Sequence, residues 1–274
     1  MLIGITGSTG VLGKELLKSI NRKTYKISRF KGDITKHYQL YDWFKNKNFD
    51  ILIHLAAVVP IKEVEKDKKK AKKINYDGTH NLIKCIKKFS KKKRIWFFFS
   101  STSHVYGYSK VKFKENDNTK PLNYYAKTKL MSEKLIIKNK NFYNYCIGRI
   151  FSYTSVRQNK NYFIPSVFSK LNSKNKIIKF NNLNHFRDFL SLEDICFGIN
   201  ILMNKKATGI YNICSSKKIS LRKIVNTLNL KKKKLFFNEN SKQTVLFGNN
   251  RKLKKLKWNI KYINYLNYLK SIYK

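Results

Sequence analysis

The stretch Leu2-Ile-Gly-Ile-Thr6, followed at once by Gly7-Ser-Thr-Gly10-Val-Leu-Gly13, decides the fold of this chain of 274 residues. The first five residues predict a short apolar strand, and residues 14–20 continue at helical spacing. Gly7 permits a tight turn, Gly10 lets a pyrophosphate approach the backbone, and Gly13 lets strand and helix pack closely. A glycine-rich turn can join any strand and helix, but this order at the N-terminus favours the first half of a dinucleotide-binding unit.

Further strands and helices alternate behind this unit. Residues 25–30 and 50–57 predict two more strands, with a helix through Trp43 between them. Residues 62–73 are highly charged and predict a solvated helix. Residues 94–101 (RIWFFFSS) are mostly apolar, which is typical of a central parallel strand buried on both faces. The alternation predicts an α/β fold with a Rossmann-type doubly wound parallel sheet.

Tyr125 and Lys129 lie four residues apart at the start of a helical stretch. Residues at i and i+4 share one helix face, so the phenol and the ammonium can address the same small volume. A free phenol has a pKa of about 10, and a lysine ammonium together with a bound cofactor cation can lower it by favouring the phenolate. Because the chain holds 17 tyrosines, this spacing also arises by chance, and the neighbouring motifs decide its meaning.

The second predicted strand bears on the choice of cofactor. NAD sites usually place an acidic residue at this strand, whereas NADP sites place an arginine nearby. The strand here carries Ser28-Arg29 and no acid. This favours NADP over NAD, although an arginine in so basic a chain can also be a plain surface charge.

The net charge of +45, from 60 basic and 15 acidic residues, suggests two classes of partner. Nucleic acid and anionic membrane surfaces both attract such a chain. The excess of lysine, however, accompanies many Asn, Ile, Phe and Tyr, the residues that AT-rich codons specify, and the lysines are spread along the sequence. We therefore predict that the charge reflects genomic composition and that the chain does not bind nucleic acid.

Cysteine usage and hydropathy indicate a cytoplasmic protein. The four cysteines lie far apart inside apolar segments, without metal-ligand or redox spacing: Cys85, Cys146, Cys196 and Cys214. They are predicted to be small core residues of a protein in a reducing compartment, and no metal site is predicted. His54, inside an apolar run, is likewise predicted to be a core residue. No stretch approaches the ~18 apolar residues of a membrane span, and the N-terminus favours a strand over a signal peptide.

Several short motifs occur in one order along residues 1–214. They are TGSTGVLG (6–13), GDIT (32–35), HLAA (54–57), NYDGT (75–79), FSSTSHVYG (99–107), YAKTK (125–129), RDFLSLED (187–194) and YNIC (211–214), and LKKLKW (253–258) follows them. By this ordered set the chain resembles the extended short-chain dehydrogenases/reductases, the superfamily of NAD(P)-dependent nucleotide-sugar epimerases, dehydratases and reductases. Each motif is modest alone, but their order is specific.

The resemblance implies roles for four residues in the reaction. Tyr125 would be the acid/base acting on a sugar oxygen, Lys129 would bind the nicotinamide ribose and lower the pKa of Tyr125, and Thr102 would hold the substrate oxygen. Arg187 matches the arginine that contacts the diphosphate of the sugar nucleotide. A guanidinium suits this task because its donors form a fork that fits phosphate oxygens.

The resemblance also implies a cofactor groove. Gly7, Gly10 and Gly13 would carry the pyrophosphate, and Asp33 would meet the adenine. The whole set implied for NAD(P) binding consists of Gly7, Gly10, Val11, Leu12, Gly13, Ser28, Arg29, Asp33, Ile34, Ala56, Ala57, Asn75, Tyr125 and Lys129.

Two domains are implied as well. Residues 1–150 would form the NAD(P)-binding Rossmann domain, and residues 151–274 would form most of a small C-terminal substrate-binding domain. Elements around 185–214, including a helix at 190–204 and a strand at 209–214, would return to the main sheet.

Further expectations concern the partners of the chain. A nucleotide sugar would bind beside residues 163–168 (FIPSVF), and helices at 78–90 and 124–139 would pair two copies into a homodimer through a four-helix bundle. His104 and His185 are weaker candidates for substrate contacts, and we predict that neither takes part.

The residues leave three functions open. Dehydratases of the superfamily carry an Asp-Glu pair directly after the threonine, whereas this chain has Ser103-His104, which argues against 4,6-dehydration. We favour 4-keto reduction of a nucleoside-diphosphate deoxysugar, since Arg29 and the short link to GDIT resemble the reductases. The alternatives are an NAD-dependent 4-epimerase of nucleotide sugars and a catalytically silent dinucleotide-binding regulator or scaffold. Polysaccharide or deoxysugar biosynthesis is the expected pathway.

Overall fold

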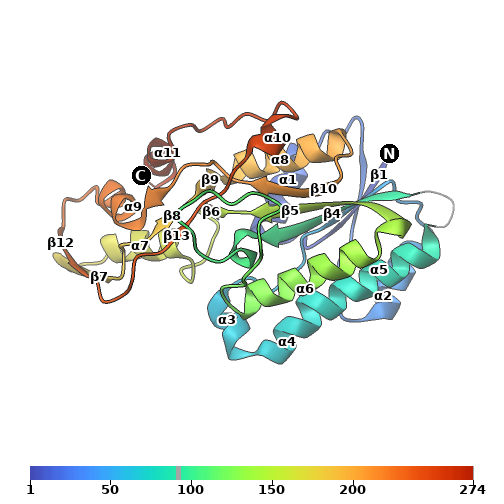
Figure 1. The fold of residues 1–274 in the computed structure, drawn as a ribbon, viewed down its shortest axis with the longest axis horizontal. Helices are drawn as coiled ribbons and strands as arrows, with labels where there is room; N and C mark the ends of the chain where they lie inside the picture. The colour runs from blue at the N-terminus through green and yellow to red at the C-terminus, as the bar shows by residue number, and fades with distance from the viewer. Residues whose placement is uncertain (91–93, 274) are drawn as a thin grey trace.

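The chain is built around a parallel sheet of six strands. The computed structural model describes residues 1–90 and 94–273, and Figure 1 shows the strands at its centre. They are β1 (Leu2–Thr6), β2 (Lys26–Arg29), β3 (Ile51–His54), β4 (Ile95–Thr102), β5 (Tyr143–Ile150) and β10 (Gly209–Ile213). Their order is β10-β5-β4-β3-β1-β2, and every pairing is parallel. The predicted Rossmann-type sheet is confirmed.

The order of the strands creates a place for a ligand. β2 and β3 lie on opposite sides of β1, so the direction in which the chain adds strands reverses at β1. In open α/β sheets the carboxyl ends of the strands form a crevice at such a switch point. The glycine-rich turn that follows β1 lies at this crevice.

Helices cover both faces of the sheet (Figure 1). α1 (Val11–Ser19) and α8 (Leu192–Asn204) pack on one face, and α2 (His37–Lys45), α5 (Gly78–Phe89) and α6 (Tyr124–Lys138) pack on the other. Successive side chains of β4 point to opposite faces, so that Trp96 and Phe98 enter the first core and Phe97 and Phe99 enter the second. This explains the apolar run of β4, because both of its faces are buried.

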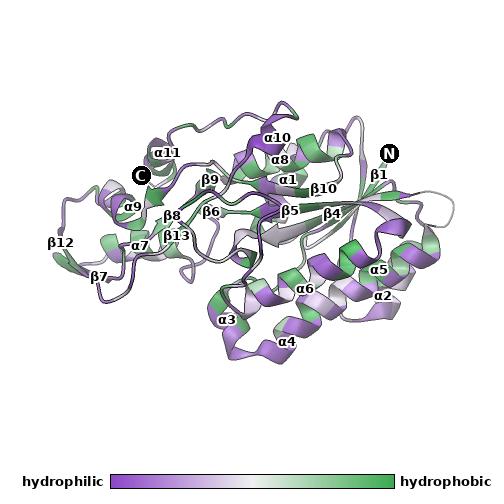
Figure 2. Ribbon diagram, in the orientation of Figure 1, coloured by the Kyte–Doolittle hydropathy of each residue, from purple (hydrophilic) through white to green (hydrophobic). Residues whose placement is uncertain are grey.

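The predicted helix over residues 62–73 is interrupted. The structure has α3 (Ile61–Lys66) and α4 (Lys68–Lys72), followed by a turn of π-helix, η1 (Lys73–Asp77), that leads into α5. Asp67 ends α3, and its side chain accepts a hydrogen bond from the backbone N of Lys70 (2.8 Å) at the start of α4. A short acidic side chain that bonds the backbone favours such a cap over the interior of a helix. Figure 2 shows α4 as a largely hydrophilic segment.

The chain after β5 contributes to both halves of the molecule. α8 and β10 return to the main sheet. A separate core is built by α7 (Phe163–Leu171), β7 (Ile177–Asn181), α9 (Leu221–Leu228), β12 (Lys234–Asn238) and α11 (Tyr265–Ile272). Short strands connect the two parts: β6 (Ser152–Thr154) pairs with β9 (Phe189–Ser191), and β8 (Phe186–Arg187) lies between β11 (Ile219–Ser220) and β13 (Val245–Leu246). Trp258, which follows α10 (Arg251–Lys254), packs back against α8.

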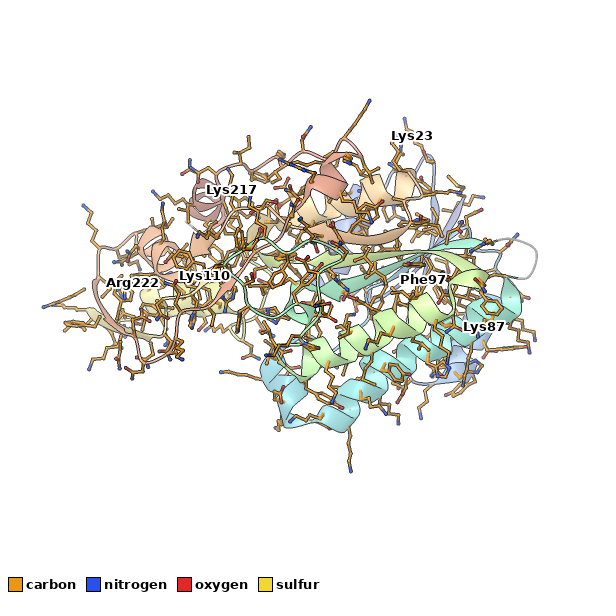
Figure 3. The ribbon with its side chains drawn as sticks, viewed as in Figure 1. Lys23, Lys87, Phe97, Lys110, Lys217 and Arg222 are labelled. Carbon is orange, nitrogen blue, oxygen red and sulfur yellow. The ribbon has the colours of Figure 1, made fainter. Side chains whose placement is uncertain are left out.

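The surface is basic on many sides. Lys23, Lys87, Lys217 and Arg222 are exposed and lie far apart in Figure 3, whereas Phe97 is buried. All four cysteines are buried free thiols. Among residues 1–90 and 94–273, no helix is both long and apolar enough to cross a bilayer, and no three potential metal ligands are grouped.

A buried ion pair fixes α6 to the sheet. Glu133 on α6 and Arg149 on β5 are 1% and 4% exposed. Arg149 donates to the carboxylate of Glu133 from Nη2 (2.7 Å) and from Nε (3.2 Å). Ser101 on β4 donates a further hydrogen bond to Oε1 of Glu133. The pair thus joins one helix to two adjacent strands, and these hydrogen bonds offset the desolvation of both charges.

Arg149→Met should lower the free energy of unfolding by about 3–5 kcal/mol, because it leaves the Glu133 carboxylate buried without a counter-charge. Adding Glu133→Gln should recover part of this loss. Denaturant titration measures both effects. The matched control is Arg222→Met, since the side chain of Arg222 is 45% exposed in its pair with Glu239, and it should leave the midpoint nearly unchanged. An equal loss in the control would contradict the role given to burial.

Candidate active site

The glycine-rich loop is shaped to hold a dinucleotide. Gly7 has a φ of +72°, and a Cβ there would collide with the backbone of Ala56. A Cβ at Gly13 would collide with the carbonyl of Gly7, so these two glycines are required by the packing of the protein itself. A Cβ at Gly10 would instead meet only the Gly7 carbonyl, at 3.5 Å, and would otherwise project into open space. Gly10 therefore keeps free the surface that a pyrophosphate needs.

The first turn of α1 offers backbone donors to that surface. Gly10 is the N-cap of α1 and supplies no side-chain hydrogen bond to it. Amide groups at the start of a helix lack partners within the helix and attract anions. The side chain of Leu12 is buried in the core, so Leu12 can serve a cofactor only through its backbone, whereas the side chain of Val11 is only half-buried.

Ser28 and Arg29 at the end of β2 have different environments. Arg29 is exposed, and its Nε donates to the hydroxyl of Ser8 in the glycine-rich loop (3.1 Å). The hydroxyl of Ser28 accepts a hydrogen bond from Nε1 of Trp43 (2.9 Å). Arg29 is thus held beside the loop as a cofactor ligand should be, whereas the Ser28 hydroxyl already has a partner in the protein.

Asp33 and Ile34, two other predicted cofactor residues, also differ in their environment: the first is exposed and the second is buried. Asp33 is exposed and accepts from the backbone N of Thr35 (2.8 Å), which lowers the pKa of its carboxyl. Ile34 packs into the core between α2 and α5. The GDIT motif therefore exposes Asp33 and buries the side chain of Ile34, and the contact of Asp33 with an adenine stays a prediction.

Asn75 positions the loop after β3. Its side chain accepts from the backbone N of Val58 (2.8 Å) and donates to the carbonyl of Val58 (3.1 Å) and to the hydroxyl of Thr128 on α6 (3.1 Å). Asn75 is 1% exposed. It holds the half-buried Ala56–Ala57 segment next to α6, so its contribution to a cofactor site is indirect.

His54 is a core histidine, as predicted. Thr79 donates to the carbonyl of Asn75 (2.7 Å), so its hydroxyl oxygen accepts from Nε2 of His54 (3.0 Å). The other ring nitrogen, Nδ1, then accepts from the hydroxyl of Thr6 (2.7 Å). Burial lowers the pKa of His54 to about 3, and both nitrogens of the neutral ring are used inside the protein.

The three predicted catalytic residues come from β4 and α6. Thr102 ends β4, and its hydroxyl oxygen accepts from the backbone N of His104 (3.3 Å), which leaves the hydroxyl proton free to be donated. Tyr125 is the second residue of α6, and Lys129 lies one turn further along the same helix. Asn123 begins this helix by accepting from the backbone N of Ala126 (2.8 Å).

Desolvation keeps the phenol of Tyr125 in its protonated form. Desolvation raises the pKa of Tyr125 well above its ordinary value, and the nearby phenols of Tyr153 and Tyr162 add to the effect. The sequence predicts that Lys129 lowers the pKa of Tyr125, but the protein chain alone does not show this lowering. It would have to accompany a bound cofactor. No motif indicates Tyr153, in β6, or Tyr162, at the start of α7, because only the folded chain brings them near Tyr125.

Lys129 is buried against an aromatic ring. Its side chain is 2% exposed, and Nζ lies 4.0 Å from the centre of the Phe99 ring. Desolvation lowers the pKa of Lys129 from 10.5 to about 7, and the charge of Glu133 on the next turn of α6 partly opposes this. A ligand that supplies hydrogen-bond acceptors would therefore favour the charged ammonium.

Arg187 lies in β8, away from the glycine-rich loop. Its guanidinium stacks 5.1 Å from the ring centre of Tyr108 and donates to the carbonyl and hydroxyl of Thr244 (3.1 and 3.0 Å). Burial lowers the pKa of Arg187. These contacts fix the plane of the guanidinium, and its role toward a diphosphate stays a prediction.

Asp188, the next residue, fastens this strand to the main sheet. It is fully buried and accepts from the backbone N of Ser215 (2.7 Å), Ser216 (2.9 Å) and Gly248 (3.2 Å), and from the Ser215 hydroxyl (2.6 Å). Burial raises the pKa of Asp188 to about 6, and these hydrogen bonds oppose the shift. The two charged residues of the RDF motif thus have different roles. Asp188 holds the end of β8 in place, and Arg187 projects from that strand.

His104 and His185, the other two histidines considered in the sequence, lie in different parts of the structure. His185 accepts from the backbone N of Thr244 (3.2 Å), beside the small sheet of β8. His104 lies directly after Thr102, and its Nδ1 is 3.2 Å from Nδ2 of Asn123. His104 thus lies next to a predicted catalytic residue, and whether it contacts a substrate stays a prediction.

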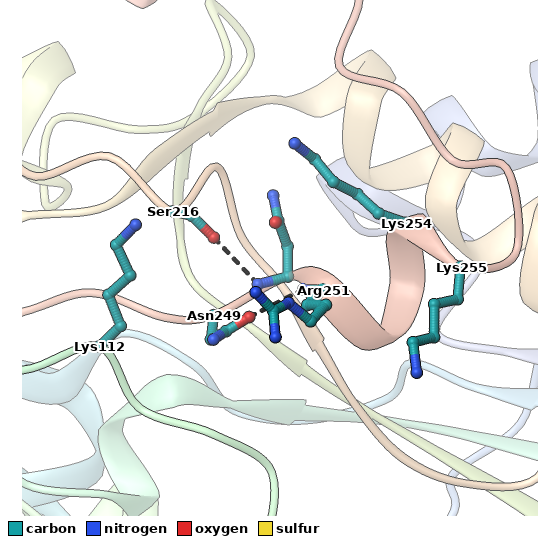
Figure 4. A pocket seen from close by; sticks show the side chains of 7 residues that line it. Lys112, Ser216, Asn249, Arg251, Lys254 and Lys255 are labelled. Carbon is teal, nitrogen blue, oxygen red and sulfur yellow. Dashed lines mark hydrogen bonds between the residues drawn. The ribbon is translucent and has the colours of Figure 1, made fainter.

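A hollow of about 520 Å³ lies apart from these residues. Figure 4 shows Lys112, Arg251, Lys254 and Lys255 around it, with Ser216 and Asn249. None of the residues predicted to bind the cofactor or the sugar lines this hollow. The predicted site instead lies along the carboxyl ends of β1, β3 and β4.

The fold and the crevice together define an extended short-chain dehydrogenase/reductase. Residues 6–264 match the family model described as GDP-mannose 4,6 dehydratase, and the chain belongs to this family. It is 28% identical over 236 residues to GDP-6-deoxy-D-talose 4-dehydrogenase of Aggregatibacter actinomycetemcomitans, a match that covers 83% of this chain and 79% of the relative. It is 26% identical to GDP-6-deoxy-D-mannose reductase of Pseudomonas aeruginosa, over 65% of this chain and 62% of the relative.

Solved structures share the fold over nearly the whole chain. RMD from Pseudomonas aeruginosa, complexed with NADPH, superposes with a TM-score of 0.87 at 20% identity and covers 99% of this chain and 98% of its own. UDP-glucose 4-epimerase of Thermus thermophilus, in complex with NAD, gives a TM-score of 0.84 at 14% identity, over 98% and 99% of the two chains. The same architecture thus occurs with both dinucleotides.

Lys129→Met should stabilise the chain below pH 7, and the gain should fade between pH 7 and pH 10.5. In this window the folded protein binds fewer protons at Lys129 than the unfolded chain, so the stability of the wild type rises with pH. The methionine variant lacks this dependence. Thermal unfolding of both proteins at several pH values measures the difference, and a gain that stays constant with pH would count against a buried, depressed lysine.

Proposed function

We propose that the chain is an NAD(P)-dependent oxidoreductase that reduces the 4-keto group of a nucleoside-diphosphate deoxysugar. The proposal is supported by Thr102 at the end of β4 and by Tyr125 and Lys129 on α6, which packs against β4 and the turn that follows it. The glycine-rich loop follows β1 at the same edge of the parallel sheet. A dinucleotide-binding regulator or scaffold would not need a buried acid/base set, so an enzyme is the better explanation.

The protonation states suit a reduction. A bound nicotinamide would supply the hydride that reaches the sugar carbon. The phenol of Tyr125 is protonated, which is the form that can give a proton to the developing alkoxide. Thr102 can donate its free hydroxyl proton to the same oxygen, and the ammonium of Lys129 would stabilise the phenolate that remains.

The relatives support the choice of substrate class. Their names specify a 4-dehydrogenase of GDP-6-deoxy-D-talose and a GDP-6-deoxy-D-mannose reductase. The family model is described by a 4,6-dehydratase, but Ser103 and His104 supply no carboxylate at the position where dehydratases carry the Asp-Glu pair. We therefore propose that the chain acts after the dehydration step and not in it.

Several finer expectations belong to the same proposal. Arg187 would contact the diphosphate, and two copies would pair through α5 and α6. The chain would act in the cytoplasm, in polysaccharide or deoxysugar synthesis. An NAD-dependent 4-epimerase is the second candidate, supported by UDP-glucose 4-epimerases among the relatives, one of which is 34% identical over 40% of this chain.

Tyr125→Phe should keep the affinity for NADPH and lower kcat by about a hundred- to ten-thousandfold, because the proton donor is lost. Oxidation of NADPH by GDP-4-keto-6-deoxymannose, followed by absorbance, measures this. Tyr124→Phe is the matched control, because the ring of Tyr124 lies beside Lys68 on α4 (5.8 Å), and it should turn over like the wild type. Full activity of Tyr125→Phe would exclude the role assigned to the phenol.

Arg29→Asp should reverse the preference for NADPH over NADH. An acid at this position repels the 2′-phosphate of NADPH and can accept from the 2′-hydroxyl of NADH. Loss of a charged contact of this kind weakens NADPH binding about tenfold or more. Titration of stripped protein with each dinucleotide measures the ratio, with Arg22→Asp, another exposed arginine, as the control for net charge.

The same titration separates the candidate functions. NAD retained through purification would favour the 4-epimerase, because such an enzyme returns the hydride to its substrate. An empty site that prefers NADPH would support the reductase. Failure to bind either dinucleotide would refute the proposed function.

A further inference from the structure

The backbone of His104 is held at the carboxyl edge of the sheet, directly after β4. His104 lies in a turn of 3-10 helix, η2 (Ser103–Val105), that follows β4 directly. Its backbone N donates to the hydroxyl oxygen of Thr102 (3.3 Å), and its carbonyl accepts from the backbone N of Leu122 (3.0 Å). The backbone of His104 is thus bonded both to Thr102 and to the segment that leads into α6.

The helix cap of α6 determines which ring nitrogen of His104 bears the proton. Oδ1 of Asn123 accepts from the backbone N of Ala126 (2.8 Å), and this bond fixes the orientation of the amide. The group that faces Nδ1 of His104, at 3.2 Å, is therefore Nδ2 of Asn123, which can only donate. Nδ1 must accept, so the proton of the neutral ring is on Nε2.

Nothing else in the described part of the chain occupies Nε2. Residues 1–90 and 94–273 provide no hydrogen-bond acceptor for it, and it is not among their fully enclosed polar atoms that lack a partner. Nε2 is therefore not completely enclosed, although the ring is largely surrounded by protein, and a hydrogen-bond acceptor for it would have to come from outside the described residues.

The surroundings also keep the ring uncharged. Desolvation lowers the pKa of His104 to about 4, and the positive charge of Arg187 adds to this shift. Arg187 therefore lies close enough to act on the imidazole electrostatically. His104 thus lies near Thr102 and also near Arg187, the residue predicted to contact the diphosphate.

We propose that His104 is a specificity-determining residue of the sugar site: a neutral imidazole that donates a hydrogen bond from Nε2 to an oxygen of the bound sugar. The proposal rests on the proposed function. A donor at this point selects a hydroxyl or keto oxygen and rejects a sugar that lacks it. A bare nitrogen would be needed to remove a proton from carbon, and Nε2 is not bare.

The tautomer can be observed without any activity. The chain has five histidines, and His104→Gln identifies the signals of His104 in long-range proton–nitrogen spectra. We expect a neutral ring with its proton on Nε2 at pH 7, and a change in the Nε2 signal when GDP-mannose is added to the NADPH complex. A proton on Nδ1, a charged ring, or a Nε2 signal that does not change when GDP-mannose binds would overturn the proposal. Absence of both nucleotide-sugar binding and turnover would instead refute the proposed function, and the inference with it.

Asn123→Asp tests the mechanism with a minimal change. Asp caps a helix as well as Asn does, so α6 should remain intact. A carboxylate, however, can only accept, so Nδ1 of His104 must now donate, and the negative charge should raise the pKa of His104 toward or above its ordinary value of about 6.5. Below that pKa the charged ring still donates from Nε2. Above it, Nε2 is bare.

The expected signature is a new pH dependence. In Asn123→Asp, kcat/KM should fall about tenfold or more as the pH rises through the new pKa of His104, and the wild type should lack this step. The step should be absent from the double variant with His104→Gln. Asn264→Asp makes the same change at the N-cap of α11, where Asn264 accepts from Leu266 and Asn267, and it should leave the profile unchanged. A profile of Asn123→Asp that matches the wild type would show that Asn123 does not govern His104.

Discussion

The buried ion pair between Glu133 and Arg149 is the constraint on which the site depends. Glu133 lies one turn beyond Lys129 on α6, and two turns beyond Tyr125, so all three share one helix face. Arg149 and Ser101 hold the carboxylate from two neighbouring strands. Because a helix is stiff over this length, the anchor at Glu133 also fixes the height of Tyr125 and Lys129 at the carboxyl edge of the sheet. The same anchor also positions Thr102, because Thr102 directly follows Ser101 at the end of β4.

Desolvation shapes the chemistry of this edge more than direct ion pairing does. It raises the pKa of Tyr125 and lowers that of Lys129, so both groups are driven toward their neutral forms. A neutral phenol is a proton donor, and a nearly neutral amine beside Phe99 is a buried group without strong compensation in the protein. The depressed pKa of Lys129 costs stability at neutral pH, whereas the raised pKa of Tyr125 does so only near and above about pH 10, where the unfolded phenol ionises. A ligand that offers hydrogen-bond acceptors to the Lys129 ammonium would relieve the first cost.

Polar side chains around the crevice divide into those that face a ligand and those that hold the frame. Asn75, His54 and Asp188 satisfy their hydrogen bonds within the protein. Gly10 and the Nε2 atom of His104 are left accessible instead. Sequence motifs contain members of both groups because both are needed for the same geometry. This is why a motif identifies the site more reliably than it assigns the role of each residue within it.

The sequence by itself determined the elements whose causes are local. The strand, glycine turn and helix at residues 2–20, the buried run of β4 and the spacing of Tyr125 and Lys129 follow from φ angles and from neighbours within a few positions. The tertiary structure decided everything that depends on distant partners. It placed Phe99 under Lys129, directed the Ser28 hydroxyl to Trp43, and brought Tyr153 to Tyr125. It also set the tautomer of His104 through Asn123, 19 residues further along the chain. Burial and hydrogen-bond partners arise only when segments remote in sequence meet, so no local pattern could contain them.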